Sequence, residues 1–205
     1  MKFDYVIGNP PYQEVDGGSG ASATPVYNKF IEETKTLNPT AMSFIIPAKW
    51  YSGGKGLDKF REQMLNDKRM AVLVDYPNSL DVFPNVDVAG GVCYFVWAKS
   101  HDGKCYYINY RDGVKTSEYR DLNEFSTFIR YPIAAEIVKK VRLKGEQTLD
   151  TIVSSRKPFG LATNVKPLKA GDIQLRFNGG IGPYKRSLIS TGIENIDRYK
   201  IVISY

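Results

Sequence analysis

The stretch Phe3–Gln13, FDYVIGNPPYQ, decides how this sequence is interpreted. It opens with an apolar run, Tyr5–Gly8, which is typical of a buried strand, and it continues directly into the prolines Pro10 and Pro11. A proline has a fixed φ and no N–H, and the residue before it is pushed out of helical conformations. Two consecutive prolines therefore predict a stiff, extended turn whose carbonyl groups have no partners within the turn.

Apolar strands and amphipathic helices alternate after this turn. Strands are expected at 42–47, 70–76 and 92–98, and helices at 25–37 and 56–66. Continuous apolar strands that alternate with helices predict an α/β sheet covered on both faces. Ligands bind at the carboxyl ends of strands in such sheets, so the proline turn is a candidate site.

The pattern changes after about residue 99. Residues 104–113, KCYYINYRDG, alternate as in a hairpin, and 132–143 have the spacing of a helix. From about 148 onward the chain shows short strands separated by Gly and Pro turns. We expect an α/β domain over 1–120 and a small β-rich module over 121–205.

Composition limits the classes of partner and site. The 205 residues carry a net charge of +6, which allows nucleic acid as a partner without requiring it. No apolar run is long enough to span a membrane, and the N-terminus lacks the features of a signal peptide, so a cytoplasmic protein without a membrane partner is expected. Cys93, Cys105 and His101 do not have metal-ligand spacing, which predicts reduced structural thiols and no metal.

The turn offers a specific set of chemical groups. Asn9 has a carboxamide oxygen and Pro10 a carbonyl oxygen, and both are hydrogen-bond acceptors. Tyr12 adds a flat aromatic face. Two acceptors and a ring on a rigid turn can hold a planar ring that carries an NH₂ group, because the acceptors take both amino protons while the rings stack.

This stretch resembles the catalytic motif of amino-group DNA methyltransferases, [N/D/S]-P-P-[Y/F/W], in the form used by the adenine-N6 class. Residues 25–51 resemble the helix and strand that follow the motif in restriction–modification adenine methylases of the Eco57I type. Residues 81–100 resemble a segment that brings a Phe against the extruded base, and 187–205 resemble target-recognition sequence of the same family. The resemblance covers most of the chain, and the context of the motif makes it specific.

The resemblance implies a fold and site residues. The fold is the C-terminal half of a Rossmann-like methyltransferase sheet, whose last strand is antiparallel, followed by a partial target-recognition domain. The base is flipped out of double-stranded DNA, and S-adenosyl-L-methionine is the cofactor. The implied catalytic residues are Asn9, Pro10 and Tyr12, with Asn9 also facing the cofactor; the implied substrate-binding residues are Pro11, Phe83, Lys185 and Arg186.

Structural roles compete with these functional ones. Phe83 also suits a loop aromatic that plugs the core, and Lys49, Trp50 and Tyr51 suit packing better than DNA contact. Any single cation in the last third of the chain suits a solvated surface. The glycine-rich segment 178–184 is expected to be a turn, because no helix follows it.

The family's methyl-donor elements precede the Asn-Pro-Pro-Tyr motif, which begins here at residue 9. We therefore expect a fragment that lacks the cofactor-binding half, is inactive alone, and needs a missing N-terminal half or a partner subunit. The strand over residues 3–8 would then have an exposed apolar edge, which favours pairing with another chain. A dimer through that edge is expected.

The sequence thus predicts an adenine-N6 DNA methyltransferase fragment from a restriction–modification system. Two alternatives remain: a non-catalytic DNA-binding specificity module, and methylation of another planar amino nitrogen, such as cytosine N4 or a protein glutamine. No Asp/Glu-x-Lys strand pattern supports a nuclease.

Overall fold

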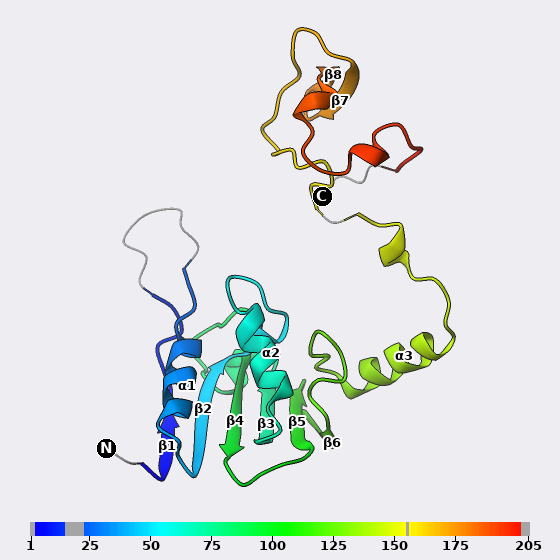
Figure 1. The fold of residues 1–205 in the computed structure, drawn as a ribbon. Helices are drawn as coiled ribbons and strands as arrows, with labels where there is room; N and C mark the ends of the chain where they lie inside the picture. The colour runs from blue at the N-terminus through cyan, green and yellow to red at the C-terminus, as the bar shows by residue number, and fades with distance from the viewer. Residues whose placement is uncertain (1–2, 15–22, 155, 202–205) are drawn as a thin grey trace. The chain divides into compact units, whose positions relative to one another are not determined.

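The computed structural model describes residues 3–14, 23–154 and 156–201, and these form two compact units, 1–143 and 144–205 (Figure 1). The sequence predicted a boundary after residue 120. The residues between 120 and 143 belong instead to the first unit, because Leu122, Phe125 and Phe128 are buried and Arg130 forms an ion pair with Asp75.

The first unit is built on a six-stranded sheet in the order β1-β2-β4-β3-β5-β6. Strand β4 runs antiparallel between two parallel pairs, β1 with β2 and β3 with β5. The sequence predicted a partial methyltransferase sheet whose last strand is antiparallel. Strand β4 is that strand, and its direction confirms the prediction. The strands are β1 Tyr5–Gly8, β2 Ala41–Pro47, β3 Met70–Tyr76, β4 Val92–Ala98, β5 Cys105–Arg111 and β6 Val114–Arg120.

The predicted hairpin extends this sheet. Strands β5 and β6 pair from Cys105↔Arg120 to Arg111↔Val114, and Asp112 takes a left-handed φ of 52° in the tight turn between them. Asp tolerates that conformation better than most residues. Strand β6 thereby becomes the edge opposite β1.

Helices α1, Tyr27–Thr36, and α2, Asp58–Asn66, lie over one face of the sheet (Figure 1). Their apolar residues Ile31 and Met64 are fully buried in the main core with Phe95, Trp97 and Tyr107 from the strands. Helix spacing places these residues on one side of each helix, which explains why both helices pack there.

The expectation of a sheet covered on both faces holds only in part for the described residues, because Val74 and Val92 are buried on the face opposite the core cluster but other residues there are not. Alternation along the strands sends Ile45, Tyr94, Val96 and Ile108 to the face opposite the core cluster, and there they are only partly buried. A continuous apolar strand predicts burial on both faces of the sheet, but it does not identify the element that packs against the second face.

The first unit ends with helix α3, Pro132–Leu143. The second unit contains one hairpin, β7 Ile173–Phe177 with β8 Gly180–Tyr184, and short 3₁₀ turns. The strand texture expected over 156–164 is loop, and the strand expected at the end of the chain lies partly outside the described residues. Few apolar side chains of this unit are buried, which explains why its other apolar runs do not form strands.

None of the helices in the described part of the chain is both long enough and apolar enough to cross a bilayer.

Candidate active site

Three segments leave the sheet at the same rim (Figure 1). The Asn9–Tyr12 turn follows β1, residues 48–51 follow β2, and the loop 77–91 connects β3 to β4. Because β1, β2 and β3 point the same way while β4 runs opposite, these segments meet at the carboxyl ends of the parallel strands. That rim is where α/β sheets bind ligands.

The proline turn presents its groups unevenly. The Asn9 and Pro11 residues are exposed, whereas Pro10 is buried and Tyr12 is partly buried. The end of the turn is held by backbone pairing with the chain just before α1, since Val26 N–H donates to the Tyr12 carbonyl over 3.3 Å. Asn9 therefore lies at the surface of the rim on a turn that is fixed at both ends.

Gly8 allows this turn to start where it does. Its register partner on β2 is Phe44, and a Cβ on Gly8 would lie 2.7 Å from the Phe44 ring. Phe44 in turn stacks on Phe95 at 6.2 Å in the core. The glycine before Asn9 is thus explained by close packing of an aromatic ring against the strand.

The Tyr12 hydroxyl is buried although the residue as a whole is only partly buried. Among the described residues, neither this hydroxyl nor that of Tyr27 has a hydrogen-bond partner. Burial, and secondly the nearby Cys93 thiol, raise the pKa of Tyr12. Burial also raises the pKa of Cys93 to about 12, so this thiol is a packing group and not a nucleophile. Tyr12 therefore places its hydroxyl inside the protein, although the residue as a whole is not fully buried.

Trp50 and Tyr51 are structural, as their competing interpretation predicted. Both are buried, the Trp50 indole N–H donates to Cys93 Sγ over 3.4 Å, and the Tyr51 ring packs on Phe128 at 4.8 Å. Lys49 is exposed on the same short segment.

The loop 77–91 has its own internal hydrogen bonds. The buried Ser79 hydroxyl donates to the Val86 carbonyl and accepts from the Val88 N–H. Phe83 N–H donates to the Ser79 carbonyl over 2.8 Å, and the Phe83 residue is partly buried. The loop is therefore an ordered carrier for Phe83, whose ring neither fills the main core nor stands fully in solvent.

A buried charge pair that the sequence interpretation missed holds the base of this loop. Arg130 donates from Nη2 to Asp75 Oδ1 over 2.6 Å, from Nε to Oδ2 over 2.8 Å, and from Nη1 to the Gly90 carbonyl over 2.7 Å. Asn109 also donates to Asp75. Burial by itself would lower the pKa of Arg130, but hydrogen bonding to Asp75 and the charge of that carboxylate raise it. Arg130 therefore stays charged and connects the loop to β3.

The two candidate DNA contacts in the second unit differ from each other. Lys185 is exposed, whereas the Arg186 guanidinium makes two hydrogen bonds to Asp197, at 2.8 and 2.9 Å. The backbone N–H of Arg186 also donates a hydrogen bond to the Asp172 carboxylate. Its charge is thus already neutralised by an ion pair within the unit, which the sequence interpretation did not foresee.

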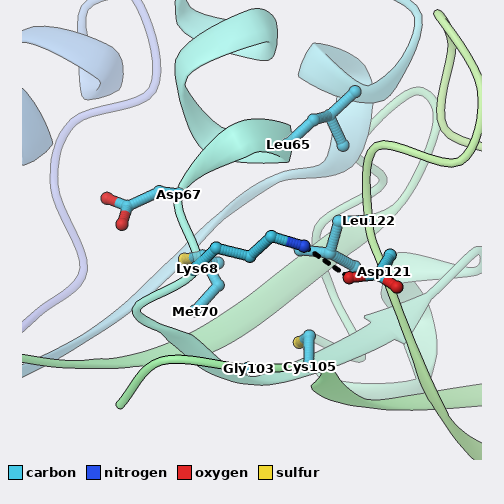
Figure 2. Close-up of a pocket in the computed structure, with 8 residues that line it drawn as sticks. All are labelled: Leu65, Asp67, Lys68, Met70, Gly103, Cys105, Asp121 and Leu122. Carbon is cyan, nitrogen blue, oxygen red and sulfur yellow. Dashed lines mark hydrogen bonds and ion pairs between the residues drawn. The ribbon is translucent and has the colours of Figure 1, made fainter. Parts of the chain in front are cut away.

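A small cavity at the amino ends of β3 and β5 is not part of this site. Its wall includes Cys105 and an ion pair in which Lys68 reaches across to Asp121 (Figure 2). It has space for about one water molecule. Burial raises the pKa of Cys105 to about 12. Both cysteines are free and buried, and the described residues contain no group of side chains that would hold a metal ion.

Comparison with known proteins bears on the turn directly. Residues 1–83 match the family model described as Eco57I restriction-modification methylase. A curated relative from Mycoplasma pneumoniae, described as an uncharacterized adenine-specific methylase, is 35% identical over 107 residues, which are 51% of this chain and 25% of the relative. The chain thus spans about a quarter of the length of that relative.

Solved structures with a similar chain path include the type I restriction-modification methyltransferase subunit from Streptococcus thermophilus, with a TM-score of 0.39, 15% identity, and coverage of 72% of this chain and 33% of that one. A second comes from a study of complex assembly in a type I restriction–modification system, with a TM-score of 0.41, 15% identity, and coverage of 76% and 34%.

The family match includes β1, the proline turn, the buried Trp50 and the start of the loop that carries Phe83. Residues 1–83 of this chain are therefore similar to the Eco57I restriction-modification methylase family.

Proposed function

We propose that this chain forms the target-base side of an S-adenosyl-L-methionine-dependent DNA methyltransferase that methylates adenine N6 within a restriction–modification system. The observation that carries the proposal is the Asn9–Tyr12 turn, fixed at the same carboxyl-end rim from which the ordered loop of Phe83 leaves the sheet. The match of residues 1–83 and the name of the curated relative support the same reaction.

The turn suits an amino group as substrate. The adenine amino nitrogen is a weak nucleophile because its lone pair is delocalised into the ring. In our proposal the Asn9 carboxamide oxygen and the Pro10 carbonyl accept its two protons, which favours a pyramidal nitrogen with an available lone pair. Pro11 keeps the acceptors rigid, so that positioning contributes much of the rate enhancement.

Aromatic rings would hold the flipped base. A base must leave the duplex before an enzyme can reach its amino group, at a cost of a few kcal/mol. The Tyr12 ring, and Phe83 from the loop 77–91, would recover roughly 1–3 kcal/mol for a stacked base. The buried Tyr12 hydroxyl suits this role, because it leaves contact with the base to the ring.

Asn9 is the residue that we propose to face the cofactor as well as the base, and its exposed position at the rim fits that role. The cofactor would supply an electrophilic methyl group. Since the chain spans a quarter of its curated relative, we expect further cofactor contacts from an additional polypeptide segment or subunit, and no methyl transfer by residues 1–205 alone.

The product identifies the reaction. The chain, alone and extended by its flanking coding sequence, would be incubated with labelled S-adenosyl-L-methionine and mixed-sequence duplex DNA, and the DNA then digested to nucleosides. Label in N6-methyladenine supports the proposal. Label in N4-methylcytosine would replace it with the cytosine reaction, and DNA binding without label in either preparation would favour a non-catalytic specificity module.

A further inference from the structure

The positive charge of this protein is concentrated in its second unit. Residues 144–205 carry ten Lys and Arg against five Asp and Glu, a net charge of +5 out of the chain's +6. The first unit is therefore close to neutral. Such asymmetry indicates a unit with a polyanionic partner.

Not all of these cations are available. Arg186 is paired with Asp197, and the Lys200 ammonium donates to three carbonyls of its own turn, those of Asn195, Ile196 and Arg198. Lys157 and Arg176, by contrast, have no ion pair or hydrogen bond from their side chains to any described residue. Lys157 and Arg176 are thus among the several cations of this unit whose charge is not used within it.

These two cations line the same groove. The groove has a volume of about 230 Å³ and lies between the segment 157–165 and strand β7. Apart from Lys157, Arg176 and Thr163, its lining is apolar and includes the rings of Phe159 and Phe177. The groove therefore combines aromatic surface with positive charge.

The glycine-rich segment of the hairpin fixes one of these rings. A Cβ on Gly179 would lie 2.6 Å from Phe177 Cε2, and a Cβ on Gly182 would lie 2.6 Å from Pro167 Cβ. Gly180 has a φ of +131° at the turn between β7 and β8. These glycines are thus explained by close packing beneath the groove and by turn geometry, with no phosphate cradle.

The backbone at the other wall is in a rare conformation. Lys157 has a φ of +59°, which is uncommon for a residue other than glycine, and it precedes Pro158, which favours an extended conformation for the residue before it. Strained residues persist only where the surroundings hold them, and they gather at binding sites.

We propose that this groove is a DNA-contact site of the second unit, in which Lys157 and Arg176 bind backbone phosphates and the two phenylalanine rings take the apolar faces of sugars and bases. The inference rests on the proposed function, since it supplies the DNA contact that the methyltransferase requires. It assigns that contact to Lys157 and Arg176 in place of Arg186, whose charge is neutralised within the unit.

The occupant follows from the charge. An apolar groove that binds a protein partner does not need an excess of unpaired cations. DNA phosphates do use such cations, and each phosphate contact releases counterions, which makes the binding depend on salt. Aromatic rings beside cations are the combination found where proteins bind nucleic acid backbones and bases together.

The test uses the full chain and a fluorescein-labelled mixed-sequence duplex, with binding measured by anisotropy at several salt concentrations. The variant Lys157→Gln/Arg176→Gln is compared with Lys144→Gln/Arg198→Gln, which removes the same charge from exposed positions of the same unit outside the groove. We expect the first to bind at least about tenfold more weakly at low salt and to lower the salt slope by roughly 2, because each phosphate contact contributes about 0.9.

Phe159→Leu completes the design, since it keeps an apolar side chain and removes the flat ring. It is expected to weaken binding by about fivefold or more at every salt concentration while the salt slope stays the same. Groove variants that bind as the Lys144→Gln/Arg198→Gln control does would overturn the proposal.

This failure is distinct from failure of the proposed function. If the protein methylates adenine and the groove variants bind DNA as well as wild type, only the groove proposal fails. If the groove variants lose DNA binding but no form of the protein methylates adenine, the groove proposal stands and the proposed methyltransferase function fails.

Discussion

Arg130 forms a two-point ion pair with Asp75 across 55 residues of sequence, and the same guanidinium donates to the Gly90 carbonyl. The Asp75 side chain has an exposed fraction of 0%, and that of Arg130 only 19%. The pair joins β3, the loop 77–91 and the segment before α3, so three parts of the rim depend on one interaction.

Arg130→Ala is expected to lower the free energy of unfolding by about 3–5 kcal/mol, because it leaves a buried carboxylate without its countercharge. Arg130→Lys keeps the charge but not the planar set of donors, and we expect an intermediate loss. Urea unfolding followed by tryptophan fluorescence measures both.

Arg61 provides a matched control. Its side chain is 20% exposed, and it also pairs with an Asp and donates to a backbone carbonyl, but its partner Asp58 is 66% exposed. Arg61→Ala should cost only about 1 kcal/mol. If Arg61→Ala and Arg130→Ala lower the free energy of unfolding equally, burial of Asp75 does not determine how much its ion pair stabilises the fold.

Acid stability should depend on Asp67. Its carboxylate, 7% exposed, accepts hydrogen bonds from Lys35, Arg69 and the Trp97 indole. Burial alone would raise the pKa of Asp67, but the hydrogen bonds from Arg69 and Lys35, the charge of Lys35 and the Trp97 N–H outweigh it and hold the pKa below its ordinary value.

Because the folded-state pKa is lowered, the stabilisation is complete above the unfolded-state pKa of about 3.9 and is lost as the pH falls toward the folded-state value. Asp67→Asn should cost roughly 2 kcal/mol at pH 7, and the difference from wild type should shrink below about pH 4. Asp102→Asn, at an exposed position, serves as the control. A difference for Asp67→Asn that stays constant with pH would contradict this account.

Tyr12→Phe separates ring from hydroxyl. It removes a buried group without a described hydrogen-bond partner, so we expect unfolding free energy to rise by about 1 kcal/mol. Methyl transfer by the extended protein should remain within a factor of about 2, whereas Tyr12→Ala should lower it by at least tenfold through loss of stacking. A large loss of transfer in Tyr12→Phe would mean that the hydroxyl has a role in the reaction.

The edge strand β1 should drive self-association. Tyr5 and Ile7 are 72% and 84% exposed on the partly covered face of the sheet, and the outer backbone groups of β1 have no neighbouring strand. Exposed apolar strand edges pair with other chains. Light scattering of the chain should show dimers or larger species at high concentration, and Ile7→Lys should disperse them.

Val114→Lys is the control, because Val114 is exposed on β6 at the other edge of the same sheet. A monodisperse wild-type monomer, or equal dispersal by both lysine variants, would count against association through β1.

Local patterns predicted most of the first unit. The apolar runs over 70–76 and 92–98 match β3 and β4, because a strand's burial is visible in its own residues. The domain boundary was misplaced because Phe125 and Phe128 occupy irregular chain without a period, so their burial depends on contacts with distant residues such as Tyr51.

The proline turn was also predictable, since its chemistry is contained in four adjacent residues. Asp75 and Arg130 were not, because they are 55 residues apart. The one available signal was an acid near the end of an otherwise apolar strand, which demands a buried partner without naming it. The Arg186–Asp197 pair was hidden for the same reason.

The proposed methyl transfer depends on the Asn9 carboxamide, which a single substitution removes. Methyl transfer from labelled S-adenosyl-L-methionine to duplex DNA would be compared for the extended protein, its Asn9→Ala variant, and Asn123→Ala, an exposed asparagine away from the rim. The account predicts N6-methyladenine from the wild type and from Asn123→Ala, with a loss of at least 10²-fold in Asn9→Ala. Undiminished transfer by Asn9→Ala would contradict it.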